Sequence, residues 1–190
     1  VVVSTAGGAI GRAIAPAGAS RGSREALDLR DGGTKLAGMD VQKALAGIRE
    51  AVAPKLIGLD VADQRGIDHA MISLDGTPLK SRLGGNATVA TSLAVMHAAA
   101  AAKGLPLWAH LAETYGRKPS SPLPEIQIFG GGAHASQRID IQDFMVMVPG
   151  AKDFDEVMEV TGEIFRAAGS LMTRRVGAVG VADEGGWWPS

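Results

Sequence analysis

Three prolines between residues 117 and 124 divide this sequence into two parts with different patterns. Proline lacks a backbone N–H and fixes φ, so the segment cannot be helical and is held extended. We therefore predict a domain boundary here. One domain is expected over residues 1–117 and a second over residues 118–190.

The first part has the pattern of a small antiparallel sheet followed by helices. Two runs with β propensity, Val1 to Thr5 and Arg12 to Ala15, flank Gly7-Gly8 and predict a β-hairpin. Apolar residues then recur at helical spacing, and Asp40 is expected to cap the first helix with its side chain. Helices are predicted from Asp40 to near Pro54, after Asp60, from Asn86 to Lys103 and from Leu107 to Tyr115. A hairpin followed by helices predicts an α+β domain.

The second part alternates strands with a helix. Strands are predicted over 125–129, 144–148 and 178–181, and a long helix from Phe154 to about Arg175 lies between the last two. The order strand, strand, helix, strand predicts the opening segment of a β/α barrel of the TIM type.

Composition excludes several classes of function. The chain carries 19 basic and 20 acidic residues without a basic stripe, so we expect no nucleic-acid partner. It has no cysteine, which excludes disulfides and thiolate metal sites. No apolar run is long enough to span a membrane and no secretion signal opens the sequence, so a cytoplasmic protein is expected. The chain starts in a strand-like run without methionine, and we expect the protein to be longer than these residues.

A glycine-rich stretch, Gly130-Gly131-Gly132-Ala133-His134, invites two interpretations. Gly130, Gly132 and Ala135 have the G-x-G-x-x-A spacing of a dinucleotide-binding turn, but no apolar-faced helix follows directly, as such a turn requires. The alternative is a flexible lid that carries His134 towards a substrate. We favour the lid.

Polar side chains follow or precede the predicted strands of the second part. Gln142 and Asp143 lie at the mouth of one strand, and Asp183 and Glu184 lie at the mouth of another. If these strands are parallel, their carboxyl ends converge and bring the side chains close to His134. Such a group can bind an anion, place a metal ion and move protons, although Asp183-Glu184 alone could be a charged turn.

The sequence resembles the enolase family. The matching motifs run in order across nearly all 190 residues: Gly11-Arg12-Ala13, Pro16-Ala17-Gly18-Ala19-Ser20, Glu25 to Gly32, Gly85-Asn86-Ala87, Gly104-Leu105-Pro106-Leu107, Gly131 to Ala135, Gln142-Asp143-Phe144-Met145 and Asp183-Glu184-Gly185-Gly186. The resemblance implies an α+β domain before a β/α barrel, and Mg²⁺-dependent dehydration of 2-phosphoglycerate to phosphoenolpyruvate by a homodimer.

The resemblance also assigns roles to individual residues. It implies that Glu184 is the acid that assists loss of the 3-hydroxyl and that His134 helps close the site. Gln142 and Asp143 match positions that contact the substrate, and Ser20 matches the serine that completes a second Mg²⁺ site. The base lysine, the main metal carboxylates and a phosphate-binding arginine are expected in the rest of the barrel.

Some positions depart from the family pattern and leave alternatives open. They are Ala17, Arg21, Gly130, Asp143 and Trp187-Trp188, where the family has serine, threonine, asparagine, glutamate and smaller residues. A shorter acid at a substrate position could weaken or redirect catalysis. The alternatives are an enolase-superfamily enzyme that acts on another carboxylate, and a non-catalytic enolase-like binding or structural protein.

Overall fold

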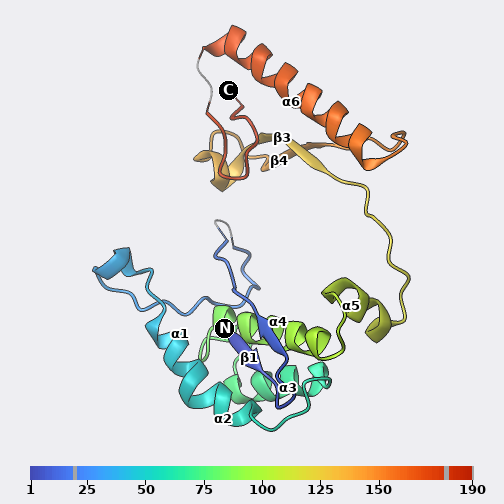
Figure 1. The fold of residues 1–190 in the computed structure, drawn as a ribbon. Coiled ribbons are helices and arrows are strands. Elements are labelled where there is room, and N and C mark those ends of the chain that lie inside the picture. Colours follow the sequence, from blue (N-terminus) through green and yellow to red (C-terminus); the bar gives the residue numbers. More distant parts are fainter. Residues whose placement is uncertain (19–20, 178–179, 190) are drawn as a thin grey trace. The chain divides into compact units, whose positions relative to one another are not determined.

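The computed structural model describes residues 1–18, 21–177 and 180–189. The chain divides into two compact units, Val1–Pro119 and Ser120–Ser190. Figure 1 shows the elements of both units.

The first unit opens with a two-stranded antiparallel sheet, β1 (Val2–Ser4) and β2 (Ile10–Arg12). The predicted hairpin is confirmed, but its second strand lies earlier than predicted and ends at Arg12, where the predicted run begins. Val3 pairs with Gly11 at the centre of the register. The hairpin packs on helix α4 (Gly85–Ala102), and the approach is so close that a Cβ on Gly11 would lie 2.0 Å from the carbonyl oxygen of Ala94. Only glycine leaves room for this contact.

Helices make up the rest of this unit. A turn, η1 (Lys35–Gly38), precedes the helical run α1 (Gln42–Gly47), η2 (Ile48–Val52) and α2 (Ala53–Leu56), and α3 (Gln64–Asp75), α4 (Gly85–Ala102) and α5 (Leu107–Tyr115) follow. The run 42–56 continues past Pro54 because this proline lies in the first turn of α2, directly after the π-helical turn η2. Gly104 and Gly116, just beyond α4 and α5, have positive φ angles of 66° and 59°, as expected after helix ends.

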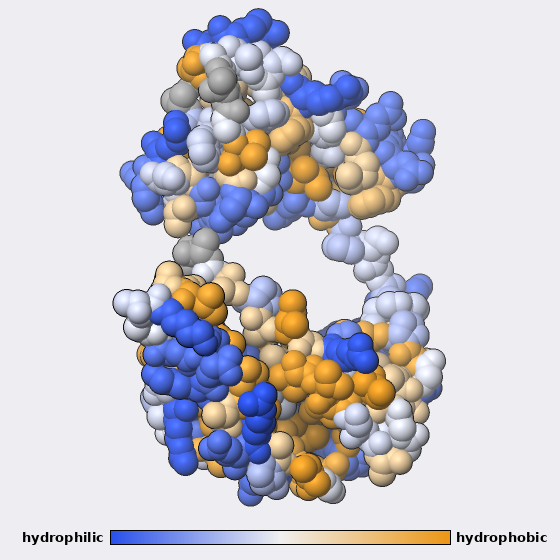
Figure 2. Space-filling model, turned by 60° about the vertical axis from the view of Figure 1, so that its left-hand side comes forward, coloured by the Kyte–Doolittle hydropathy of each residue, from blue (hydrophilic) through white to orange (hydrophobic). Residues whose placement is uncertain are grey.

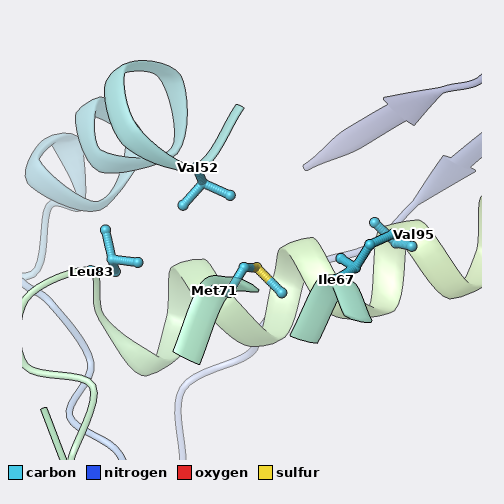
Figure 3. Packing of buried hydrophobic residues seen from close by; sticks show 5 residues of the cluster. All are labelled: Val52, Ile67, Met71, Leu83 and Val95. Atoms are coloured by element: carbon cyan, nitrogen blue, oxygen red, sulfur yellow. The ribbon is translucent and has the colours of Figure 1, made fainter. Parts of the chain in front are cut away.

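The core of the first unit lies where these helices pack against one another. It contains Val52, Ile67, Met71, Leu83 and Val95, each 3% exposed or less. Figure 3 shows Met71 and Ile67 of α3 beside Val95 of α4, with Val52 and Leu83 close by. Large apolar side chains are also exposed on this unit, Ile57 and Trp108 among them, and hydrophobic surface is visible over it in Figure 2.

The prediction that Asp40 caps the first helix is wrong. The residue that precedes α1 is Val41, which makes no side-chain cap. The carboxylate of Asp31 takes that role, because its two oxygens accept hydrogen bonds from the backbone N–H groups of Gln42 (2.9 Å) and Lys43 (2.8 Å). Asp40 instead accepts from the N–H of Val41 and the side chain of Gln42. These two hydrogen bonds, that of Gln42 foremost, hold the pKa of Asp40 below its usual value.

The second unit contains the strands β3 (Ile126–Gly130) and β4 (Asp143–Val146), the turn η3 (Gly132–Ala135) and the long helix α6 (Phe154–Val176). Asp153 caps α6 by accepting from the N–H of Glu156. Of the expected strand 178–181, residues 178 and 179 lie outside the described part, and Val181 pairs with Trp187 in an isolated antiparallel bridge.

The strands of the second unit are not all parallel. β3 and β4 pair antiparallel, and the described parallel pairing is a single bridge between Phe129 and Trp187. The segment between the two strands, residues 131–142, contains the turn η3 but no α-helix, so it does not form the helical crossover that usually connects parallel strands. The structure is therefore α+β, with a small antiparallel sheet and helices in the first unit. In the described residues, no helix is both long and apolar enough to cross a membrane.

Candidate active site

The candidate site lies in the second unit, where β3, η3, β4 and the turn 183–186 meet. The antiparallel register places Gly130, at the carboxyl end of β3, opposite Asp143, at the amino end of β4. The turn reaches the other side of β3, because the N–H of Gly130 donates to the carbonyl of Trp187 (3.1 Å). Side chains from four separate segments can therefore lie close together.

Glycines let these segments approach. A Cβ on Gly131 would lie 2.1 Å from the carbonyl oxygen of Ile141, and one on Gly130 would lie 2.7 Å from the Cβ of Ala182. The backbone of the loop is closed by hydrogen bonds from Gly131 N–H to Gln142 (2.6 Å) and from Gly132 N–H to Ile139 (2.9 Å). Gly132 has a φ of 54°, which favours glycine. The glycine stretch thus forms a tight turn that presents His134, and no dinucleotide-binding helix follows it.

His134 bridges the two acidic residues of the turn. Its Nδ1 lies 2.7 Å from Oδ1 of Asp183, and its Nε2 lies 2.9 Å from Oε1 of Glu184. The side chain of His134 is only 10% exposed, whereas those of Asp183 and Glu184 are 60% and 36% exposed. The imidazole is therefore enclosed while both carboxylates remain accessible from solvent.

This arrangement can share one proton between His134 and Glu184. With both carboxyls ionised, the imidazole must be doubly protonated to donate to both. With Glu184 protonated, the neutral imidazole donates from Nδ1 to Asp183 and accepts at Nε2. The positions of the heavy atoms fit both forms. Asp183 fixes the orientation of the ring in either case, as the third group of a hydrogen-bonded chain does.

Gln127 is a site residue that the sequence reasoning missed. Its Nε2 donates to Oε2 of Glu184 (2.7 Å) and to Oδ1 of Asp143, and its Oε1 accepts from the N–H of Gly186 (3.0 Å). A glutamine within an apolar strand gave no signal by its type. The alternation along β3 could have found it, because every second residue of a strand points to the same face.

The predicted substrate residues lie next to this network. Gln142 donates from Nε2 to Oδ2 of Asp143 (3.1 Å), so both oxygens of Asp143 are held by glutamine amides. The structure thus brings together His134, Gln142, Asp143 and Glu184. The predicted metal residue Ser20 lies outside the described residues.

Two tryptophans hold the turn in place. Trp187 stacks on Phe165 of α6 with ring centroids 4.8 Å apart, and its Nε1–H donates to the carbonyl of Phe165 (2.9 Å). The guanidinium of Arg138, on the loop after η3, lies 4.6 Å from the ring centre of Trp188. A cation over an indole face is attracted by the ring. The pair therefore fixes the acidic turn to the helix and to the loop that carries His134.

Comparison with known families agrees with this geometry. Residues 1–111 match the enolase N-terminal domain, and residues 118–190 match the enolase C-terminal TIM barrel domain. The chain belongs to the enolase family. The two matched domains are those of an enolase-type lyase, and the second unit holds part of the enolase barrel domain.

The described residues of this enolase-family chain do not by themselves form a metal centre. Residues 1–18, 21–177 and 180–189 contain no group of three or more histidine or acidic side chains arranged to hold a metal ion. The carboxylates of the site are engaged by protein groups: Gln127 donates to Asp143 and Glu184, and His134 contacts Asp183 and Glu184. An octahedral Mg²⁺ site requires several oxygen ligands that point at one centre.

Proposed function

We propose that this enolase-family protein dehydrates 2-phosphoglycerate to phosphoenolpyruvate, as in glycolysis. The observation that supports this best is the hydrogen-bonded chain from Asp183 through His134 to Glu184. It supports the proposal because an accessible carboxyl group, able to exchange a proton with an enclosed imidazole, lies beside the carboxyl end of β3, and barrel enzymes hold their catalytic groups at the carboxyl ends of strands.

In the proposed reaction Glu184 is the general acid. Its carboxyl proton passes to the 3-hydroxyl of the substrate while the C3–O bond breaks, and water leaves. The electron pair of the C2–H bond becomes the C2=C3 double bond, and the C2 proton passes to the lysine base that the family resemblance implies. Glu184 then regains a proton from Nε2 of His134 or from solvent.

His134, Gln142 and Asp143 are proposed to contact the substrate. Gln142 and Asp143 border Glu184 through the Gln127 amide, so a substrate hydroxyl that reaches Glu184 also comes near them. The turn η3 and its loop would close over the substrate and exclude water, which strengthens hydrogen bonds to developing charge.

The Mg²⁺ requirement is carried by the resemblance to enolases alone. The described residues do not fit a metal centre of their own. Ser20 remains a proposed Mg²⁺ ligand on the strength of the resemblance. A cytoplasmic homodimer, with residues 1–117 as one domain and 118–190 as part of the barrel, completes the proposal; sedimentation tests the dimer.

The test is an assay of the purified protein with 2-phosphoglycerate and Mg²⁺, followed by the absorbance of phosphoenolpyruvate. Turnover that disappears in Glu184→Gln supports the proposal. A folded preparation that contains the complete barrel and shows no turnover would overturn it.

A second candidate is a reaction of the enolase superfamily on another carboxylate. It is favoured by Asp143, which is one methylene shorter than the family's glutamate and has both oxygens occupied by amides. Asp143→Glu discriminates between the two candidates. A site for 2-phosphoglycerate tolerates or gains from the longer acid, whereas a site shaped around the shorter side chain loses activity on its own substrate.

A non-catalytic enolase-like protein is the third possibility. It predicts that Glu184→Gln leaves the biological role of the protein intact. Complementation of a strain that depends on the protein, with wild type and Glu184→Gln in parallel, separates this possibility from both enzymes.

A further inference from the structure

Gln127 connects two carboxylates that come from distant parts of the sequence. Its amide nitrogen on β3 lies 2.7 Å from Oε2 of Glu184, 57 residues later, and also donates to Oδ1 of Asp143, 16 residues later. An amide NH₂ has two protons, so it can donate one to each acid at the same time.

The orientation of this amide is fixed by the backbone of the acidic turn. Oε1 of Gln127 accepts from the N–H of Gly186 at 3.0 Å. The reversed amide would set its NH₂ against that N–H and leave both carboxylates facing an oxygen. A Cβ at Gly186 would lie 2.4 Å from the same oxygen, so the turn and the glutamine are fitted to each other.

Both polar atoms of the Gln127 side chain thus have hydrogen-bond partners, and one of these partners is Glu184. Oε2 of Glu184 faces Gln127 and Oε1 faces His134, so both of its oxygens are held. Without the amide, Glu184 and Asp143 would face each other as like charges, which repel at short range. We propose that Gln127 is a positioning residue that holds Glu184 and Asp143 in place for the reaction; this inference rests on the proposed function.

The variant Gln127→Glu isolates this role. It has the same shape and keeps an oxygen to accept from Gly186, but it replaces both donated protons by a third negative charge. With 2-phosphoglycerate as substrate, kcat is expected to fall on the order of 100-fold, as for a misplaced general acid, while KM changes less than about threefold. Because the introduced carboxyl donates again when protonated, part of the loss is expected to recover as the pH is lowered.

Two further variants keep the experiment decisive. Ala167→Glu adds the same charge at an exposed position of α6, away from the site, and is expected to leave kcat unchanged. Gln127→Met is neutral and of similar length, and it is also expected to lower kcat. It serves as the test if the carboxylate introduced by Gln127→Glu prevents folding. A wild-type-like kcat in folded Gln127→Glu or Gln127→Met overturns the inference and leaves the proposed function standing.

A crystal structure of Gln127→Glu separates the two proposals if the wild type itself shows no turnover. The inference expects Glu184 to rotate away from residue 127 while the contact with Gly186 persists. A structure in which Glu184 and Asp143 both keep their places overturns the positioning role, whatever the reaction of the protein is.

Discussion

The indole ring of Trp187 lies directly on Gly169 of α6, where a Cβ would come within 2.4 Å of the ring. Gly169 is buried, and the ring also stacks on Phe165, four residues earlier on the same helix. We predict that Gly169→Ala destabilises the second unit by about 1–3 kcal/mol through overpacking, despite the higher helix propensity of alanine. Chemical unfolding followed by tryptophan fluorescence measures the change.

Gly162 provides the matched control on the same helix. It is exposed, and a Cβ there meets no atom within 4 Å. Gly162→Ala is therefore expected to stabilise by about 0.5–1 kcal/mol, because alanine restricts the unfolded chain and favours the helix. Equal effects of the two substitutions would contradict the packing argument.

The contact between the hairpin and α4 gives a second packing prediction. The Cβ of Gly11→Ala would lie 2.0 Å from the carbonyl oxygen of Ala94 and 2.2 Å from the nitrogen of Ala98, and backbone atoms of a helix cannot yield cheaply. We expect a loss at the upper end of the ~1–3 kcal/mol range for overpacking. Gly7→Ala, whose Cβ has its nearest neighbour at 4.0 Å, is expected to stay within about 0.5 kcal/mol of wild type. Thermal unfolding of both variants checks the difference.

Local sequence signals predicted most elements but not the contacts between them. α5 and the start of α6 follow from apolar spacing, Gly116 and the Asp153 cap, which act within a few residues. Asp40 has the right residue type in the right place, yet Asp31 reaches the helix end across 11 residues. Such a cap depends on how the preceding loop folds back, which no local pattern specifies.

The candidate site shows the same division. The motifs identified His134, Asp143 and Glu184, because acids and a histidine beside glycines are recognisable by type. The antiparallel pairing of β3 with β4 was not predicted, and it is this pairing that sets Gln127 between the two acids. The role of Gln127 arises from register, which the sequence of one strand does not determine.

The cap of α1 is tested by comparing two aspartates. Asp31→Ala removes the acceptor for two N–H groups and is expected to cost about 1 kcal/mol of stability. Asp40→Ala is expected to have the smaller effect, because Asp40 bonds only the N–H of Val41 in the backbone. Urea unfolding of both variants decides; a larger loss for Asp40→Ala would assign the cap to Asp40 after all.

The buried carboxylate of Asp75 makes the stability of the first unit depend on pH. It is 2% exposed and accepts from the N–H groups of Thr77, Arg82 and Leu83. Burial raises the pKa of this carboxyl, but the hydrogen bonds, led by the Thr77 hydroxyl, outweigh it and set the pKa below the ordinary 3.8. Because the folded pKa is the lower one, the ionised group stabilises the fold above the unfolded pKa and loses this effect as the pH falls through the folded pKa.

Asp75→Asn tests this response. The substitution points an NH₂ group at buried backbone donors and is expected to cost about 1–3 kcal/mol at neutral pH. The difference from wild type should stay constant above about pH 5 and shrink below about pH 4. Glu50→Gln, an exposed carboxylate in the same unit, is the control, and its difference from wild type should be small throughout. A pH-independent difference for Asp75→Asn would show that the charge of Asp75 contributes nothing.

The hydrogen-bonded series Asp183, His134 and Glu184 predicts that substitutions at its two acids lower activity to different degrees. Glu184→Gln keeps the shape of the side chain but removes its transferable proton, so kcat is expected to fall by roughly 10²–10⁴. Asp183→Asn leaves that proton in place and only weakens the bond that orients His134, so a smaller loss, on the order of 10-fold, is expected. Steady-state kinetics with 2-phosphoglycerate measure both, and Asp155→Asn, an exposed acid on α6, serves as the control. A larger loss for Asp183→Asn than for Glu184→Gln would move the acid role from Glu184 to Asp183.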